Sequence, residues 1–204
     1  MRGKSDMIKR GKKPISLLEL GAGSAGRLNA LLPKIGRKVI GIDSSSRAAW
    51  HQRKGIRVRR KVPGAMLVYG KKGQAETFLR KLIAEERKVK VINAEYFFAN
   101  LGKQFLFPEA HYANIEIANT EARKILKLVK QVLVPNGRIR LQTPKLAMKR
   151  WKTILEESDF VVTSVSKVPE DKVSSWYGEE YLRKSKREKD PDFEPTQIIA
   201  RMAD

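Results

Sequence analysis

An apolar run followed by closely spaced glycines is the feature that most restricts how this chain can fold. Residues 15–20 read Ile-Ser-Leu-Leu-Glu-Leu, and Gly21, Gly23 and Gly26 follow in the pattern G-x-G-x-x-G. Glycines in this pattern allow a tight turn and a close approach of the backbone to a ligand, where a strand is followed by a helix. The segment therefore predicts a strand, a turn and a helix in an α/β fold, with a nucleotide-like ligand at the turn.

The carboxylate of Glu19 narrows the choice of ligand. Glu19 stands two residues before Gly21, at the expected end of the strand. A negative charge at this place would repel a pyrophosphate, whereas it suits a cationic ligand that also carries ribose hydroxyls. The sulfonium, amino and ribose groups of S-adenosylmethionine fit that description.

Three segments carry a resemblance to a known family. Residues 17–26, Leu-Leu-Glu-Leu-Gly-Ala-Gly-Ser-Ala-Gly, resemble the glycine motif of class I S-adenosylmethionine-dependent methyltransferases. Residues 38–44 are similar to that family's second strand, and residues 132–141 to its fifth strand and the Pro-Gly turn before it, with Asn136 in place of the more usual glycine. The resemblance implies an α/β fold with a doubly wound, mostly parallel seven-stranded sheet, helices on both faces and a last strand that enters antiparallel.

The resemblance also implies a cofactor site. Asp43 lies seventeen residues after Gly26 and would accept hydrogen bonds from the ribose hydroxyls. Asn93 would take the place of an acid that meets the adenine amino group, although a turn residue that satisfies its own backbone fits Asn93 equally well. The residues expected around S-adenosylmethionine are Glu19, Gly21, Ala22, Gly23, Gly26, Asp43, Ser44, Asn93 and Ala94.

Hydrophobic periodicity places the remaining elements in one domain over residues 15–204, after a basic segment at 1–14. Glycine and proline among basic residues suggest an inserted loop or hairpin at 55–73, and a charged flap is expected at 169–195. The expected strands cover residues 15–20, 39–42, 89–92, 112–117, 138–141, 160–165 and 197–201. Helices are expected between them, including residues 74–86 and one that Thr120 would cap.

The expected strand at 112–117 decides where catalytic residues are sought. In the methyltransferase family the loop after the fourth strand faces the methyl group, which makes Glu116 and Asn119 the candidates to orient a nucleophile or to take its proton. Amino-directed DNA and RNA methyltransferases carry Asn-Pro-Pro-Tyr or a close variant in this loop. Residues 118–121 are Ala-Asn-Thr-Glu, which argues against methylation of adenine N6 or cytosine N4.

The charge of the chain points to a polyanionic partner. There are 43 Lys and Arg against 22 Asp and Glu, a formal net charge of +21. Surfaces rich in Lys for solubility or thermal stability are the alternative, but such surfaces usually gain Glu together with Lys. We therefore expect a nucleic acid, most readily RNA such as rRNA or tRNA, to bind two basic clusters. These consist of Arg53, Lys54, Arg57, Arg59, Arg60 and Lys61, and of Arg183, Lys184, Lys186 and Arg187.

Absences in the sequence restrict the chemistry. Without cysteine, methylation of pyrimidine carbon 5 through a cysteine adduct is excluded, and two histidines without further ligands at suitable spacing predict no metal site. No apolar run is long enough to span a membrane, so a soluble, cytoplasmic protein is expected. A methyltransferase-like RNA-binding protein without catalysis, an enzyme acting on a small molecule or a protein, and an NAD-dependent oxidoreductase remain open.

Overall fold

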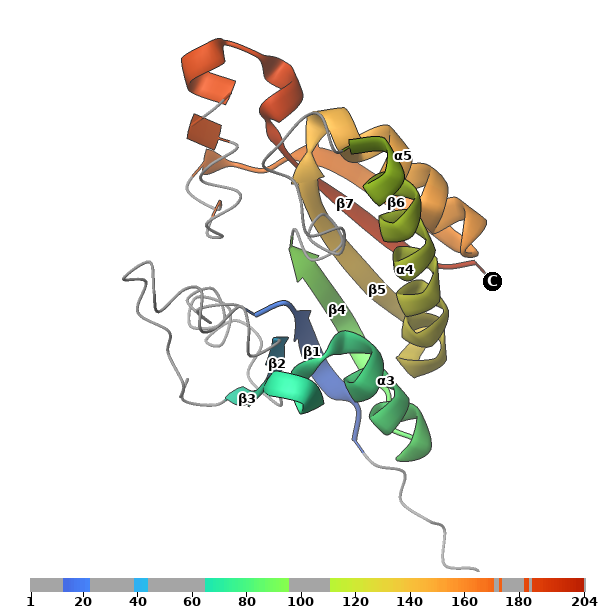
Figure 1. The fold of residues 1–204 in the computed structure, drawn as a ribbon. Helices are drawn as coiled ribbons and strands as arrows, with labels where there is room; N and C mark the ends of the chain where they lie inside the picture. The colour runs from blue at the N-terminus through green and yellow to red at the C-terminus, as the bar shows by residue number, and fades with distance from the viewer. Residues whose placement is uncertain are drawn as a thin grey trace, which may run out of the picture.

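Seven strands form one mixed sheet in a computed structural model of the chain (Figure 1). The structure describes residues 13–22, 39–43, 65–95, 111–170, 173, 182–183 and 185–203, with the backbone alone at 95 and 111–115. The strands are β1 (Ile15–Leu20), β2 (Val39–Asp43), β3 (Ala65–Tyr69), β4 (Val89–Glu95), β5 (Leu133–Pro144), β6 (Phe160–Lys167) and β7 (Pro195–Met202).

The strand order is β3-β2-β1-β4-β5-β7-β6. The first five strands run parallel, and β7 enters antiparallel between β5 and β6. The chain thus moves from β1 to β2 and β3 on one side and returns to the other side of β1 with β4. This arrangement confirms the expected doubly wound, seven-stranded sheet with an antiparallel last strand.

Three helices cover one face of the sheet, the near face in Figure 1. They are α3 (Ala75–Ala84), α4 (His111–Val132) and α5 (Lys145–Glu157), and two 3₁₀ helices, η1 (Gly70–Gly73) and η5 (Pro191–Phe193), follow β3 and precede β7. Leu79, Val129 and Trp151 are among the buried side chains of the core between these helices and the sheet. None of the described helices combines the length and the hydropathy of a membrane span. Helices expected after β1 and β2 fall outside the described residues.

The strand expected at 112–117 is wrong, because these residues belong to α4. Ile117, which suggested an alternating strand, is 59% exposed. The buried positions Ala118, Ala122, Ile125 and Val129 instead follow the three- and four-residue spacing of a helix. Thr120 lies inside this helix and does not cap it.

The seventh strand comes instead from the segment that was expected to be an inserted loop or hairpin. Residues 65–69, Ala-Met-Leu-Val-Tyr, form β3, which pairs parallel with all of β2 at the edge of the sheet. Residues 55–64 of that segment lie outside the described residues. β4 is therefore the fourth strand of the fold, although the sequence suggested that it was the third.

The Pro-Asn-Gly segment, which was expected as a turn before the fifth strand, lies inside β5, where the register with β4 shifts. Asn136 adopts φ 61°, a left-handed conformation that asparagine tolerates better than most residues. A Cβ on Gly137 would lie 2.8 Å from the carbonyl oxygen of Val134, so only glycine fits there. Asn136 and Gly137 thus fit the irregular backbone at this register shift.

Gly73, in the 3₁₀ helix that follows β3, packs closely against the backbone at the ends of β2 and β3. A Cβ at this residue would collide with the carbonyl oxygens of both Asp43 and Val68, which are backbone atoms and cannot rotate away. We predict that Gly73→Ala lowers the free energy of unfolding by roughly 1–3 kcal/mol, the usual cost of overpacking. Urea denaturation of Gly73→Ala and of Lys71→Ala, a control on the exposed side of the same 3₁₀ helix, checks this. Equal stability of the two variants would contradict the prediction.

Candidate cofactor site at the carboxyl edge of the sheet

The order in which strands are added to the sheet reverses between β1 and β4, and this reversal fixes where a ligand can enter. One connection leaves β1 toward β2, whereas β4 lies on the opposite side of β1. In open parallel sheets such a reversal leaves a crevice outside the carboxyl ends of the two strands, and ligands bind there. The polar side chains at the carboxyl ends of β1, β2 and β4 therefore form the candidate site.

Glu19 and Asn93 face each other across this reversal point. Their Cα atoms are register partners on β1 and β4, and Asn93 Nδ2 donates a hydrogen bond of 2.6 Å to Glu19 Oε2. The two side chains are only 4% and 2% exposed. A buried carboxylate is costly without donors, so this bond stabilises the charge of Glu19 inside the protein.

The same bond orients the amide of Asn93. A carboxylate can only accept, so the NH₂ group of Asn93 must be the end that faces Glu19. Asn93 Oδ1 is then left as an acceptor, buried and without a hydrogen-bond partner in the described part of the chain. Buried acceptors are rarely left unpaired in native proteins, which makes this oxygen a candidate to receive a donor from a ligand.

Asp43 brings a second buried carboxylate to the edge. It ends β2, is 4% exposed and is the register partner of Tyr69 at the end of β3. Burial raises the pKa of the Tyr69 phenol, and the nearby negative charge of Asp43 raises the pKa further. The phenol therefore stays neutral at physiological pH.

The first glycine of the motif forms the expected turn. Gly21 has φ 71°, a conformation that residues with a Cβ rarely adopt. The backbone N–H of Ala22 then donates to the carbonyl oxygen of Ile42 at 2.9 Å, which fastens the turn to β2 beside Asp43. Gly23, Gly26 and Ser44 lie outside the described residues.

Two cofactor-site expectations change with the position of β4. Asn93 was expected in a turn beside adenine, but it lies within β4 and bonds to Glu19 on the central strand. Ala94 points the other way, into the hydrophobic core under the helices. The end of β3, with Tyr69 and Gly70, occupies the position in the sheet that the sequence assigned to Asn93.

The two catalytic candidates lie on α4 and not on a loop after a strand. Glu116 is exposed on the helix. Asn119 is buried, and its Oδ1 has no partner within the described ranges. The helix location removes the reason for which both were chosen, and their roles stay predictions.

Gln142 and Thr143, near the end of β5, were not proposed from the sequence as site residues. Both are buried, and Gln142 Oε1 and Thr143 Oγ1 have no hydrogen-bond partner among the residues that the structure describes. Gln142 is the register partner of Glu95, which places it one strand away from the carboxyl end of β4. The available signal was a pair of polar residues directly after the expected strand at 138–141.

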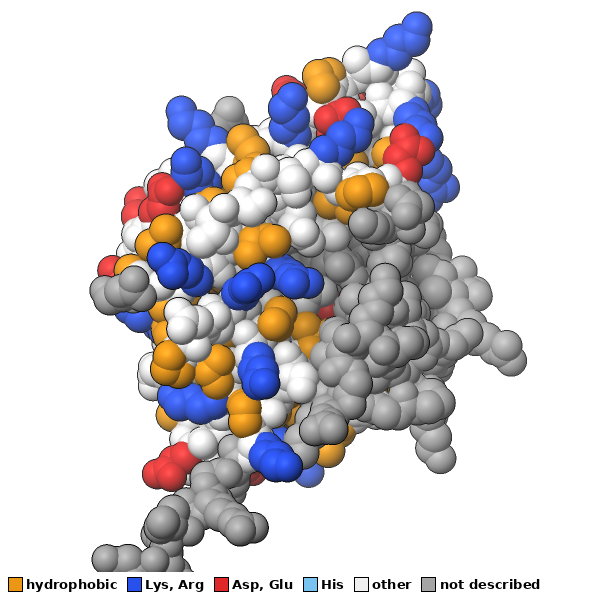
Figure 2. All heavy atoms as spheres, turned by 180° about the vertical axis from the view of Figure 1, so that it is seen from behind, with side chains coloured by type: hydrophobic (Ala, Val, Ile, Leu, Met, Phe, Trp, Pro, Cys, Tyr) orange, Lys and Arg blue, Asp and Glu red, His pale blue; other side chains and the backbone are white. Residues whose placement is uncertain are grey.

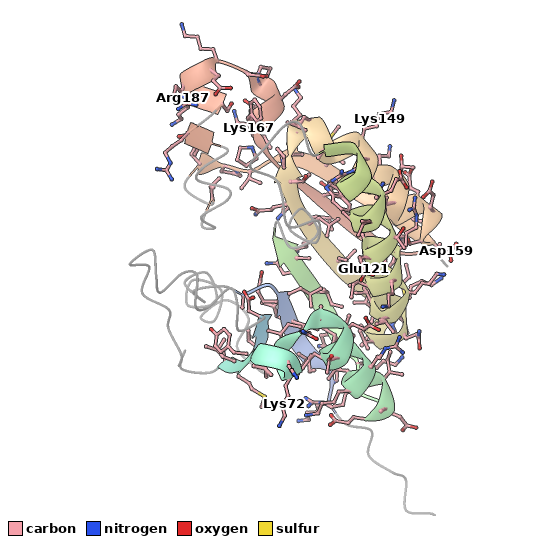
Figure 3. All side chains as sticks on the ribbon, viewed as in Figure 1. Lys72, Glu121, Lys149, Asp159, Lys167 and Arg187 are labelled. Carbon is pink, nitrogen blue, oxygen red and sulfur yellow. The ribbon has the colours of Figure 1, made fainter. Side chains whose placement is uncertain are left out.

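The second predicted basic cluster contains ion pairs. Lys186 Nζ lies 2.6 Å from Glu170, and Arg187 lies 2.9 Å from Glu188, on the C-terminal segment where Figure 3 labels Arg187. These pairs are solvent-exposed and therefore weak, so phosphates could still compete for the cations. Residues 53–61 and Lys184 lie outside the described residues. No group of three potential metal ligands occurs in the described part of the chain.

The contact between Glu19 and Asn93 allows a test by pH. In Asn93→Asp two carboxylates would meet within hydrogen-bond distance, so the pKa of one must rise above its unfolded value of about 4. The folded state then binds a proton that the unfolded chain has lost, and stability falls as the pH rises toward the raised pKa. We predict a loss of about 1.4 kcal/mol for each unit of that rise, relative to wild type.

Thermal unfolding of Asn93→Asp at pH 4.5 and pH 8 measures this effect, with Asn136→Asp at an exposed position of β5 as the control for the same chemical change. A deficit in Asn93→Asp that is equal at both pH values would contradict burial of the two side chains together.

Comparisons with known proteins identify the fold. No protein-family model and no curated protein matches the chain. The N-methyltransferase NodS from Bradyrhizobium japonicum, in complex with S-adenosyl-l-homocysteine, is 14% identical with a TM-score of 0.52, covering 94% of this chain and 80% of its own. A protein from Galdieria sulphuraria assigned as a sarcosine dimethylglycine methyltransferase is 14% identical with a TM-score of 0.50, over 95% of this chain and 79% of its own.

A third structure, assigned as a methyltransferase and complexed with SAH, is 11% identical with a TM-score of 0.55. The match covers 91% of this chain but only 45% of that protein, so this chain spans less than half of that relative's length. These likenesses, together with the strand order, show that the chain has the fold of the class I S-adenosylmethionine-dependent methyltransferases.

Proposed function

We propose that this protein binds S-adenosylmethionine at the carboxyl edge of β1 and β2 and transfers its methyl group to a nucleic acid, most readily RNA. The observation that carries the proposal is the pair of buried carboxylates, Glu19 and Asp43, at the carboxyl ends of adjacent parallel strands. Glu19 borders the reversal point of the sheet, where ligands of such folds bind. Two negative charges there suit a ligand with cationic and hydroxyl groups and oppose a pyrophosphate.

The residues present fit the parts of this cofactor. Asp43, at the end of the second strand, would accept hydrogen bonds from the ribose hydroxyls, and the turn at Gly21 allows the backbone to come close. Glu19 would face the amino group or the sulfonium. NodS, which shares the fold, was solved with S-adenosyl-l-homocysteine bound, which supports a cofactor of the same class here.

S-adenosylmethionine supplies a methyl group that its positive sulfur has already activated. In the transfer, an acceptor atom bonds to the methyl carbon while the carbon–sulfur bond breaks, the electron pair stays on sulfur, and the acceptor loses a proton to solvent. The protein therefore has mainly to align the acceptor about 3 Å from the methyl carbon and to exclude water. The transfer therefore does not require a protein side chain that acts as a nucleophile, nor a metal ion, because the acceptor atom attacks the activated methyl group directly.

The corrected place of β4 changes the acceptor that we propose. Because β4 is the fourth strand, the family's acceptor motif would correspond to the carboxyl end of this strand, Asn93-Ala94-Glu95, followed by Tyr96 in the sequence, and not to residues 118–121. This segment keeps the first and last residues of Asn-Pro-Pro-Tyr. Glu19 accepts a hydrogen bond from the NH₂ group of Asn93, so Asn93 Oδ1 remains as an acceptor. This oxygen can accept a hydrogen bond from an amino group of the substrate. We therefore propose an exocyclic amine of a base as the methylated group.

Binding of the cofactor is tested with S-adenosylhomocysteine by isothermal titration calorimetry. We predict that Asp43→Ala weakens binding about 10- to 100-fold, because hydrogen bonds to a charged acceptor contribute roughly 1.5–3 kcal/mol. Asp192→Ala, which removes an exposed carboxylate from η5, should leave the affinity unchanged. Absence of binding to the wild-type protein, or tighter binding of NADH, would refute the cofactor assignment.

The acceptor is tested by incubating the protein with tritiated S-adenosylmethionine and total RNA, DNA or protein. We predict label in RNA, released on digestion as a nucleoside methylated on an exocyclic nitrogen. Asn93→Ala should abolish the label, whereas Lys127→Ala on the exposed side of α4 should retain it. Label in no polymer, despite cofactor binding, would contradict the proposed acceptor and favour an RNA-binding protein without catalysis or an enzyme for a small molecule.

A further inference from the structure

The sheet face opposite α3, α4 and α5 carries a group of arginines, which we call the arginine face. It consists of Arg138 and Arg140 on β5 and Arg201 on β7. Arg138 and Arg201 are register partners and are both exposed, and Arg140 is half-buried. Figure 2 shows this side of the molecule, with Lys and Arg side chains at the surface over the described part.

The charges on this face have no acidic partners among the described residues. None of the three arginines takes part in an ion pair there. The acids Glu76, Glu157, Asp159 and Glu194 instead pair with lysines and arginines that do not belong to the arginine face. Like charges directly opposite each other on neighbouring strands destabilise a sheet. The repulsion between the two exposed arginines therefore destabilises the free protein. A bound anion would reduce this repulsion.

The arginine face begins one strand away from the candidate site. Arg140 is the register partner of Asn93 on β4, and Asn93 is the register partner of Glu19 on β1. Residues directly opposite on paired strands project from the same face of a sheet. Glu19, Asn93 and Arg140 thus form a row across one face of the sheet. Arg138, two residues before Arg140 on β5, and its partner Arg201 form the next row, further from the carboxyl edge.

We propose that the arginine face binds the phosphate backbone of single-stranded RNA and leads it toward Asn93. This inference rests on the proposed function and assigns its partner to a surface that is separate from the two basic clusters predicted from the sequence. The planar guanidinium of arginine binds phosphate oxygens through two parallel hydrogen bonds, so neighbouring arginines suit successive phosphates.

The composition of the surface favours nucleic acid over a membrane. Beside the arginines, β6 contributes Ser164 and Ser166 and one exposed apolar residue, Val161. An interfacial membrane surface needs a broad apolar area under its cations, and these residues do not supply one. The hydroxyl groups can instead donate to phosphate or ribose oxygens.

The test measures binding of a fluorescein-labelled single-stranded RNA by anisotropy at several salt concentrations. Arg138→Gln/Arg201→Gln should bind about tenfold more weakly at 0.1 M salt, and the slope of log K against log salt should become shallower by about 1.4, as expected for two lost phosphate contacts. The matched control, Lys127→Gln/Lys149→Gln, removes two exposed charges from the helix side, where Figure 3 labels Lys149, and should change neither the affinity nor the slope at the RNA site.

Further measurements separate this proposal from the proposed function. Calorimetry with S-adenosylhomocysteine should give the same affinity for Arg138→Gln/Arg201→Gln as for wild type, and the anisotropy assay needs no methyl transfer. RNA binding that depends on these arginines in a protein without methyltransferase activity would support the arginine face and refute the enzyme.

Three results would overturn the proposal: no RNA binding by wild type, wild-type affinity and slope in Arg138→Gln/Arg201→Gln, or an equal loss in the lysine control. Preferred binding of wild type to vesicles containing phosphatidylserine would also overturn it. Circular dichroism checks the fold of the double variant, and if it is unfolded, Arg201→Gln alone must show about half of the change in slope.

Discussion

A buried carboxylate at the end of the central strand is the constraint on which the rest of the site depends. Glu19 is almost fully removed from water, and the amide of Asn93 donates a hydrogen bond that offsets part of the cost of burying its carboxylate. The two residues are 74 positions apart in the chain, so their contact exists only because β1 and β4 pair in one register. The parallel sheet thus positions the site, and the hydrogen bond fixes which end of Asn93 remains as an acceptor.

The charges of the protein are separated by location. The buried acids Glu19 and Asp43 lie at the carboxyl edge, whereas exposed arginines cover part of one sheet face. In our account, the acids select a cationic cofactor and the arginines select a polyanionic acceptor. An edge with negative charge would repel phosphates from the cofactor position, which keeps the nucleic acid on the sheet face and leaves its base to enter the site.

The sequence predicted the central strands because a buried parallel strand reads as a mostly apolar run. Residues 15–20 and 39–42 have this pattern, and the glycines and acids at their ends revealed the edge where a ligand binds. The edge strand β3 was missed because its five residues are only partly buried and lie among glycines and basic residues. The first turns of α4 were read as a strand because Ile115 and Ile117 alternate with polar residues over a window too short to distinguish the two periods.

These two errors together moved the fourth strand, and with it the expected acceptor loop and the role given to Asn93. The contact of Asn93 with Glu19 could not be derived from spacing, because a register between distant strands is a tertiary property. The arginine face could not be predicted from the sequence either, since Arg138 and Arg201 become neighbours only through the antiparallel pairing of β5 and β7.

A crystal structure of the protein grown with S-adenosylhomocysteine tests the central claim most directly. We predict density for the ribose within hydrogen-bond distance of the Asp43 carboxylate and for the amino acid part of the ligand beside Glu19 and the turn at Gly21. Ligand density elsewhere on the molecule, or a carboxyl edge that stays empty at saturating ligand, would contradict it.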